Sequence, residues 1–251
     1  MRDVPSLASV VTPSRRAILG FLALLPNAAC GERTIAVGGA RFRVVSSGAG
    51  SRRYIHIHGN ERTARDVLSK HVQLRAGAAF LVQGDERNVS TGGLLLDPNR
   101  MFSRVGARAN LEKLNPNATP EAIGAALDTL DRELPAFLQE ALPPDGGLLI
   151  AIHNNSEGYN IHTEISISEE HHLPKPDEPN DFFLATNARD YAVLAASAYN
   201  AVLQVKPSTT DDGSLSRLCA SRGIRYVNLE CYLGRTEIQR EMLTWLDAAL
   251  P

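Results

Sequence analysis

The sequence predicts an α/β protein with three layers, α/β/α, in which helices cover both faces of a central twisted sheet that is mixed and mostly parallel. Three observations lead to this prediction. Apolar strand-like runs alternate with segments of helical periodicity over most of the chain. Several of these runs are continuously apolar, as strands buried on both faces are. Two alternating runs flank Gly38-Gly39, which predicts one antiparallel hairpin.

The first half of the chain contains a hairpin, a short strand, a helix and a buried strand. These expected elements are the hairpin strands 34–37 and 42–45, the strand 54–58, the helix 62–72 and the strand 79–82. Between 84 and 116 the periodicity is lost and Asn, Gly, Arg and Pro accumulate. We expect a long ordered loop here, and long loops inside compact domains usually carry function.

The second half of the chain begins with a helix expected over 120–142, with Thr119 as its N-cap and proline at its first position. The apolar run 147–152 predicts a buried strand that delivers His153 at its carboxyl end. An irregular stretch over 162–180 could form a lid or a rim. Regular alternation then resumes, with strands expected at 182–185, 201–205 and 226–229 and helices at 188–197, 214–222 and 236–250.

Length and charge limit the possible classes of protein. With 251 residues, of which 43% are hydrophobic, the chain can form one sizeable core, so we expect a single domain over 31–251. The 26 basic and 28 acidic residues are mixed along the chain and give a net charge of −2. Because the chain has no polybasic block, a nucleic-acid partner is not expected.

Residues 1–30 have the layout of an export signal. The pair Arg15-Arg16 precedes the apolar run 17–25, which is too short to span a bilayer, and small residues precede Cys30. The paired arginines suit the twin-arginine route, so we expect a periplasmic or envelope-anchored protein. Cys30 also follows an Ala-Ala pair that resembles a lipoprotein cleavage site. A lipid on Cys30 is therefore possible, and it is the one membrane attachment that the sequence suggests. An ordinary first helix is the alternative for this segment.

Two cysteines remain in the expected mature chain, Cys219 and Cys231. An exported protein could oxidise them to one disulfide or keep both as buried, small apolar side chains. Neither belongs to a closely spaced pair of cysteines, so a structural zinc knuckle is not expected.

Ionisable residues follow three of the expected strands, where active sites of open α/β sheets are found. They are His58, His153 and Glu230. In His58-Gly59-Asn60-Glu61 an imidazole and a carboxylate lie three residues apart across a tight turn, and glycine allows the bend that lets both face one ion. Two histidines and one glutamate form a known catalytic zinc set with an open position for water. A surface turn is the alternative for residues 58–61 taken alone.

Four elements together resemble the zinc carboxypeptidases and their relatives, the succinylglutamate desuccinylases and aspartoacylases. They lie in the family's order within residues 54–232: His58-Gly59-Asn60-Glu61, Asp97-Pro98-Asn99-Arg100 with Phe102, His153 at a strand end, and Val227-Asn228-Leu229-Glu230. The resemblance implies one Zn²⁺ per chain, held by His58, Glu61 and His153.

The same resemblance implies a role for each of the other motif residues. Asn99 and Arg100 would bind the free carboxylate of the substrate, since a guanidinium offers two parallel charge-assisted hydrogen bonds. Asp97 would orient His58 on the metal. Glu230 would take a proton from the attacking water and return it to the leaving amine. Arg87 is the candidate for polarising the scissile carbonyl.

Most of these roles have an alternative, and the roles of several other residues stay open. Arg100 could be a solvated loop arginine, Asp97 a loop cap, and Glu230 the partner of an arginine. Others whose roles stay open are Arg104 and Arg108 as substitutes for Arg87, Tyr159, Tyr191 and Tyr232 as a catalytic tyrosine, and His56 as a core histidine or a support for the metal ligands. The loop histidines His162, His171 and His172 lack ligand-like spacing, so we expect them to be solvated.

The expected function is therefore zinc-dependent hydrolysis of an amide next to a free carboxylate. The substrate would be a cell-envelope or scavenged peptide, or else an N-acyl amino acid, as for a deacylase of the desuccinylase/aspartoacylase type. A non-catalytic envelope protein that binds peptides on the same scaffold is the rival from another class. An esterase with a serine nucleophile is not supported, because the sequence has no Gly-x-Ser-x-Gly turn.

Overall fold

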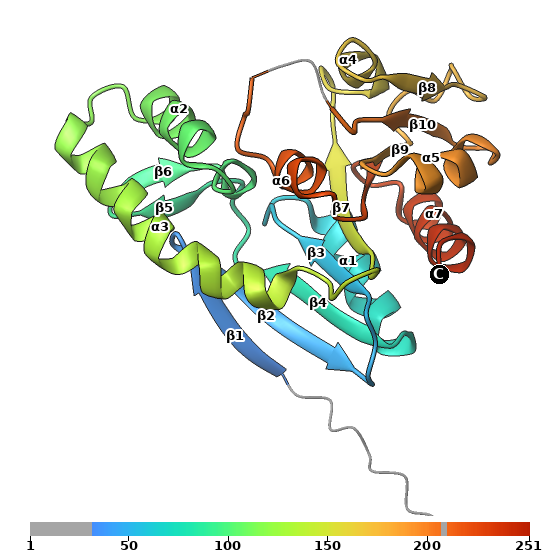
Figure 1. Ribbon diagram of the computed structural model, residues 1–251, viewed down its shortest axis with the longest axis horizontal. Helices are drawn as coiled ribbons and strands as arrows, with labels where there is room; N and C mark the ends of the chain where they lie inside the picture. The colour runs from blue at the N-terminus through green and yellow to red at the C-terminus, as the bar shows by residue number, and fades with distance from the viewer. Residues whose placement is uncertain (1–31, 207–209) are drawn as a thin grey trace, which may run out of the picture.

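A nine-stranded mixed sheet forms the middle layer of the protein (Figure 1). The computed structural model describes residues 32–206 and 210–251. The export signal expected at 1–30, with the lipid site considered at Cys30, lies outside the described residues.

The strand order is β1-β2-β4-β3-β7-β11-β9-β10-β8. The strands are β1 (Glu32–Val37), β2 (Ala40–Ser47), β3 (Arg53–His56), β4 (Gly77–Val82), β7 (Leu149–Asn155), β8 (Glu170–His172), β9 (Phe182–Ala185), β10 (Asn200–Leu203) and β11 (Tyr226–Tyr232). Strands β4, β3, β7 and β11 are mutually parallel, and β1 and β8 run in the same direction as they do. Strands β2, β9 and β10 run the opposite way. The predicted mixed, mostly parallel sheet is confirmed.

The hairpin expected at the start of the domain is formed by β1 and β2. Val37 pairs with Ala40, so Gly38 and Gly39 form a two-residue turn, and both have positive φ. A turn of this kind matches the twist of the strands and favours glycine at both central positions.

Helices α2 (Arg104–Leu114), α3 (Pro120–Ala141) and α6 (Leu215–Arg222) cover one face of the sheet. As predicted, the Thr119 hydroxyl caps α3 by accepting a hydrogen bond from the backbone N–H of Ala122, and Pro120 occupies the first position. The apolar side of α3 packs on β2 and β4, where Phe137 contacts the rings of Phe42 and Phe80. This face of the sheet also carries the candidate metal centre described below.

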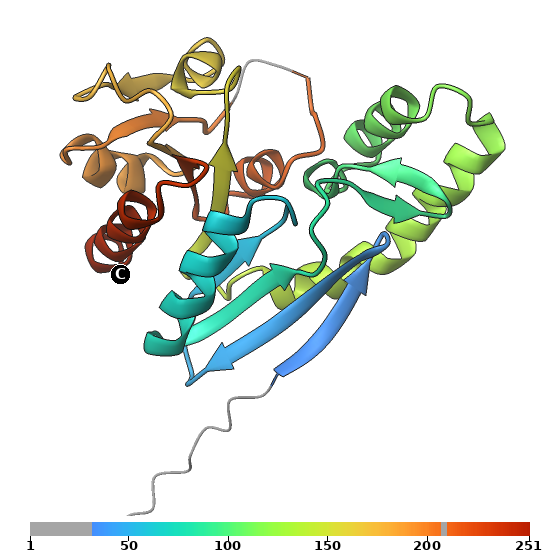
Figure 2. The same ribbon diagram turned by 180° about the vertical axis from the view of Figure 1, so that it is seen from behind.

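Helices α1 (Arg62–His71), α5 (Ala188–Ala195) and α7 (Thr236–Ala249) cover the opposite face, and Figure 2 shows α1 and α7 side by side across it. Strand β7 serves both layers, since Leu149 and Ala151 pack toward α3 and Ile150 and Ile152 pack toward α1 and α7. This alternation follows from the two-residue period of a strand. The three-layer α/β/α prediction is confirmed.

The prediction of a long loop without secondary structure over 84–116 is wrong. The segment contains a small hairpin, a 3-10 turn and a helix, namely β5 (Val89–Thr91), β6 (Leu94–Leu96), η2 (Pro98–Arg100) and α2. Helix α2 lacked a sequence signal because its buried face consists of Gly106, Ala107 and Leu111, and two of these are too small to register as apolar periodicity. Arg104 and Arg108 therefore lie exposed on a helix and form ion pairs with nearby carboxylates.

The irregular stretch expected over 162–180 is also partly regular. It begins within the short helix α4 (Ile161–Ile165) and includes the edge strand β8, which pairs with β10. His162 and His171 are exposed, as expected for solvated side chains, whereas His172 is half-buried. The remaining short element, η1 (Val72–Leu74), follows α1.

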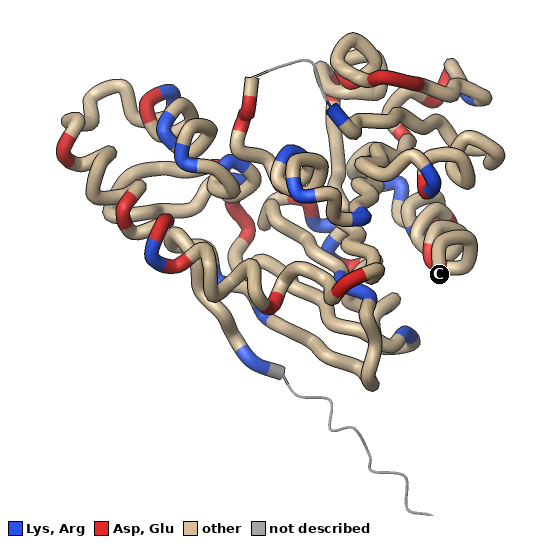
Figure 3. Tube along the Cα trace, viewed as in Figure 1, with Lys and Arg blue, Asp and Glu red and all other residues tan. Residues whose placement is uncertain are grey.

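Cys219 and Cys231 are buried free thiols on opposite faces of the sheet, so the disulfide alternative is not what the structure shows. Among the described helices, none is both long and apolar enough to cross a bilayer. Basic and acidic residues are interspersed over the described elements (Figure 3).

A buried carboxylate, Asp247 of α7, joins this helix to α1 and β3. It accepts hydrogen bonds from the hydroxyl of Tyr54 at 2.8 Å and from Nε2 of His71 at 3.1 Å, and it pairs with Arg52 and Arg75. Although burial opposes its ionisation, the hydrogen bonds from His71 and Tyr54 and the charge of Arg52 hold the pKa of Asp247 below its ordinary value.

Replacing Asp247 with asparagine is expected to lower the free energy of unfolding by about 1–3 kcal/mol at neutral pH, because charged hydrogen bonds to a buried group are lost. Since the pKa of Asp247 is lowered on folding, its contribution is present above the ordinary aspartate pKa of about 4 and is lost as pH falls through the folded-state value. Urea titrations at several pH values measure this difference. Asp145→Asn, on an exposed turn, is the control, and equal losses in both variants would contradict the expectation.

Candidate metal centre and cavity

The loop after β3 brings His58 and Glu61 together. The carbonyl of His58 accepts the backbone N–H of Glu61, and Glu61 directly precedes α1. Gly59 lies against the chain at 84–86, where its N–H donates to the carbonyl of Glu86 and an added Cβ would come within 2.6 Å of the Gly84 oxygen. A glycine is therefore required at 59 by this close approach.

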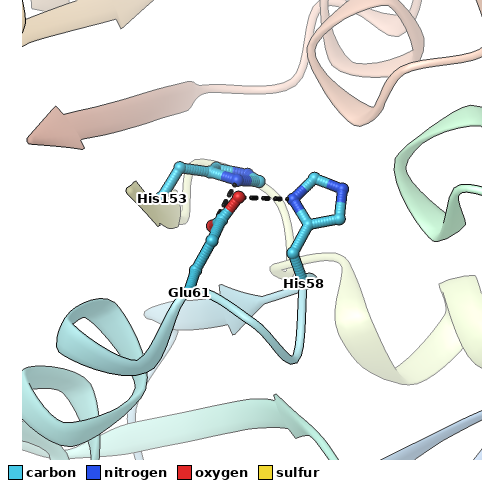
Figure 4. Close-up of side chains that lie close together, drawn as sticks. All are labelled: His58, Glu61 and His153. Atoms are coloured by element: carbon cyan, nitrogen blue, oxygen red, sulfur yellow. Dashed lines mark hydrogen bonds and ion pairs between the residues drawn. The ribbon is translucent and has the colours of Figure 1, made fainter. Parts of the chain in front are cut away.

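The structure brings all three predicted ligands to one point, as Figure 4 shows. Nδ1 of His58 lies 2.7 Å from Oε1 of Glu61, and Nδ1 of His153 lies 3.0 Å from Oε2 of the same carboxylate. One donor atom from each residue falls within a group whose members are all within 4.8 Å of one another. All three side chains are buried. Two imidazoles and a carboxylate converging in this way could hold a divalent ion.

The electrostatics of the three residues fit an ion as well. Burial opposes the charged form of Glu61, but the two adjacent imidazoles lower its pKa below the ordinary value. For His58, the carboxylates of Glu61 and Asp97 outweigh burial and raise the pKa to about 9. The group thus already places positive charge beside the Glu61 carboxylate, which is the charge that a bound cation would supply instead.

Asp97 lies where an orienting carboxylate is needed. Its Oδ1 is 2.8 Å from Nε2 of His58, so it contacts the ring nitrogen that faces away from Glu61. The same oxygen accepts the backbone N–H of Asn99 and thereby caps η2, which means that the loop-cap alternative for Asp97 is true at the same time. A carboxylate in this position fixes the tautomer and the orientation of a ligating histidine.

Of the three candidate arginines, the structure places Arg87 beside the cluster. Its guanidinium donates to Oδ2 of Asp97 at 3.1 Å and to Oε1 of Glu61 at 3.4 Å. Half of its side chain remains exposed to the cavity side. Arg104 and Arg108, on α2, are not part of this cluster.

Glu230 lies opposite His153 in the pairing of β11 with β7 and is 5% exposed. Its Oε1 accepts from Asn228 at 3.1 Å and its Oε2 from Asn155 at 3.2 Å. Burial is the largest effect on this carboxylate and raises the pKa of Glu230 to about 7. A carboxyl group with a pKa near neutrality, next to the cluster but outside it, is suited to accept and return a proton.

A cavity of about 350 Å³ connects these groups. Asn99 and Arg100, on η2, line it from one side. Oδ1 of Asn99 accepts the backbone N–H of Leu215, and Arg100 pairs with Asp212 at 3.1 Å. Gly213, at positive φ, permits this contact between the 211–214 loop and η2, since an added Cβ would meet the Arg100 carbonyl oxygen at 2.3 Å.

Several supporting residues were not predicted from the sequence. Asn154 accepts the Ala64 N–H of α1 and donates to Gln239 of α7, and Gln239 in turn donates to the carbonyl of His153. These contacts hold β7 against α1 and α7 beside the cluster. The two-residue period of β7 and β11 does indicate that Asn155 shares a face with His153, and Asn228 with Glu230.

His56 and the three candidate tyrosines lie at different distances from the cavity. His56 is fully buried, its Nε2 lies 3.0 Å from the Glu61 carbonyl, and burial lowers its pKa to about 4. It therefore supports the backbone of a predicted ligand from within the core. Tyr159 lines the cavity, whereas Tyr191 belongs to α5 in the opposite layer. Tyr232 lies at the end of β11, outside the cavity lining.

No protein-family model and no curated protein sequence matches the chain. Among solved structures, it is similar to a succinylglutamate desuccinylase/aspartoacylase from Rhodobacter sphaeroides, with 14% identity and a TM-score of 0.46 over 88% of this chain and 64% of the other. It is also similar to an aspartoacylase family protein from Mesorhizobium loti, with 14% identity and a TM-score of 0.46 over 88% and 66%.

A third similar structure is a proposed metallopeptidase from Shewanella baltica, with 12% identity and a TM-score of 0.41 over 87% of this chain and 86% of the other. The chain thus spans slightly less than two thirds of the length of the first two proteins. Proteins of the family that the four sequence elements resemble are among the structures to which this chain is similar.

Proposed function

We propose that the chain is a zinc-dependent hydrolase that cleaves an amide bond next to a free carboxylate. The observation that carries the proposal is that His58, Glu61 and His153 direct three donor atoms at one point of the cavity that Glu230 and Arg100 also line. A cluster of ligands, a proton acceptor and a carboxylate-binding group are the three parts that such a reaction needs.

His58, Glu61 and His153 would hold the zinc ion. When bound, zinc supplies Lewis acidity that polarises a carbonyl and makes water a stronger acid. Nitrogen and carboxylate oxygen donors in a set of three are the ligands of catalytic zinc sites that keep a position open. The contact between Asp97 and His58 would keep Nδ1 of His58 directed at the ion.

The remaining residues supply the proton transfers and the binding of substrate. Glu230 takes a proton from water as the carbonyl is attacked and returns it to the leaving nitrogen, and its raised pKa matches both steps. Asn155 and Asn228 hold its carboxylate in place during the cycle. Arg100 exchanges its ion pair with the exposed Asp212 for the carboxylate of the substrate, and Arg87 lies beside the cluster where carbonyl charge develops.

If residues 1–30 direct export, the available amides are cell-wall peptides, scavenged peptides and N-acyl amino acids. We therefore propose a small peptide or an N-acyl amino acid as the substrate and the cell envelope as the location.

The requirement for a free carboxylate gives the sharpest test of this function. Zinc-loaded protein is expected to hydrolyse members of a panel of dipeptides and N-acyl amino acids and to cleave their carboxamide counterparts poorly. Arg100→Gln should raise KM for the carboxylate substrates by about 10- to 100-fold, because hydrogen bonds between charged groups are lost. Arg104→Gln, on the exposed face of α2, is the matched control and should leave KM unchanged. Equal cleavage of acids and carboxamides, or full activity after removal of metal by a chelator, would refute the proposal.

A further inference from the structure

The cavity continues beyond Glu230 along the sheet to a set of residues that the proposed reaction does not use. We call Tyr159, Glu164, Gln204 and Tyr226 the distal floor. On β11, Tyr226, Asn228 and Glu230 point to the same face by the two-residue period, and Asn228 pairs with Leu184 of β9. All these side chains line the cavity. Tyr226 therefore lies on the same sheet surface as Glu230, four residues nearer the start of β11.

Glu164 of α4 is the charged group of the distal floor, and its two described side-chain partners are neutral donors. The hydroxyl of Tyr159 donates to its Oε1 at 2.8 Å, and Nε2 of Gln204 donates to its Oε2 at 2.6 Å. These contacts fix the carboxylate without cancelling its charge. Each carboxylate oxygen can accept more than one hydrogen bond, so acceptor capacity remains for a ligand.

Asn228, which also lines the cavity, carries a second acceptor. Oδ1 of Asn228 is buried and has no hydrogen-bond partner among the described residues, although Nδ2 of the same amide donates to Glu230. Asn228 is 8% exposed. A buried amide oxygen without a partner is costly, and a donor on a ligand would satisfy it.

Negative charge lies close to the two aromatic residues of the distal floor. The pKa values of Tyr159 and Tyr226 are raised well above the ordinary value, by burial first and then by nearby negative charge that includes Glu230 and Glu164. Both carboxylates therefore act on the same two rings. A cavity wall that holds two carboxylates and two phenol rings favours a cation at this end of the cavity.

We propose that the distal floor binds an ammonium group on the substrate, with Glu164 as the residue that determines this specificity. This inference rests on the proposed hydrolase function, because it names the class of substrate for the same cavity. The substrate class is an amide of a diamino carboxylic acid whose carboxylate meets Arg100 and whose side-chain ammonium meets Glu164 and Oδ1 of Asn228. Arg217 of α6 also lines the cavity, so an acidic side chain is the competitor that the experiment includes.

The test compares three Nα-acetyl amino acids that differ in the charge of the side chain: lysine, norleucine and glutamate. With the zinc-loaded protein, kcat/KM is expected to be about 10- to 100-fold higher for the lysine derivative than for the norleucine derivative. Glu164→Gln should reduce this ratio to near one. Glu157→Gln, an exposed carboxylate on the turn between β7 and α4, removes the same charge nearby and should keep the ratio.

A binding measurement separates this inference from the proposed function. Calorimetric titration with free L-lysine, L-norleucine and L-glutamate is expected to give the tightest binding for lysine, and Glu164→Gln should abolish the advantage. If no derivative is hydrolysed but this binding pattern is found, the hydrolase proposal fails and the ammonium site stands. If the wild type prefers norleucine or glutamate, the ammonium site is wrong.

The variants also decide whether Glu164 is responsible. A lysine preference that persists in both Glu164→Gln and Glu164→Ala would overturn its assignment. Thermal unfolding of each variant checks that it folds. The ranking of the three ligands by the wild type needs no variant, so the inference can be refuted even if both substitutions prevent folding.

Discussion

Replacing Glu230 with glutamine is expected to lower kcat by about 100- to 10,000-fold while the protein keeps its full zinc content. The reason is that glutamine preserves the size of the side chain and can still bond Asn155 or Asn228, but it cannot take a proton from water. Because Glu230 lies outside the group of three ligand atoms, its loss should not release the ion. Steady-state kinetics and elemental analysis of the same preparations measure the two quantities.

Glu157→Gln is the control for this variant, since it removes an exposed carboxylate from the turn after β7. Unchanged kcat in Glu230→Gln would remove Glu230 from the reaction. A parallel loss of zinc and kcat would instead make Glu230 a ligand.

Replacing His153 with alanine is expected to weaken zinc binding by about two to three orders of magnitude, if the apparent binding energy of a zinc site is divided among its ligands. Asp97→Ala should weaken it less, by about 10- to 100-fold, because Asp97 orients His58 without contacting the ion. Competition with a fluorescent chelator measures both affinities.

His171→Ala, an exposed histidine on β8, is the control and should bind zinc as the wild type does. The expected order of zinc affinities places His153→Ala lowest and Asp97→Ala between it and the control. This order distinguishes a residue that binds the ion from one that orients a ligand. Equal affinities in all three variants would show that zinc binds elsewhere.

Much of the fold could be predicted because strong local signals coincide with the elements. Thr119 and Pro120 indicate the start of α3, and Gly38-Gly39 indicates the β1–β2 turn. No such signal indicates α2, because Gly106 and Ala107 form much of its buried side and close packing replaces large apolar residues there. The strand predicted at 226–229 ends before Glu230, because this charged residue interrupts the apolar run. In the structure β11 extends to Tyr232.

The three metal-ligand candidates could be predicted because His58 and His153 lie at strand ends in the sequence pattern, Glu61 lies three residues after His58, and the family resemblance joins the three in one set. The residues that hold these ligands in place could not be predicted from the sequence. Gln239 reaches the carbonyl of His153 from α7, and Asn154 reaches α1, and contacts between distant segments leave no local pattern. Glu164 lies on a five-residue helix in a stretch that reads as irregular, so its place in the cavity depends on how α4 packs on β10.

The most direct measurement is a crystal structure of zinc-loaded protein with anomalous data collected on both sides of the zinc absorption edge. We expect one strong zinc peak per chain, about 2.0–2.2 Å from Nδ1 of His58, Nδ1 of His153 and the carboxylate of Glu61. An absence of zinc at this point, or a peak at His171 and His172 of β8 instead, would contradict the metal centre on which the proposed hydrolysis depends.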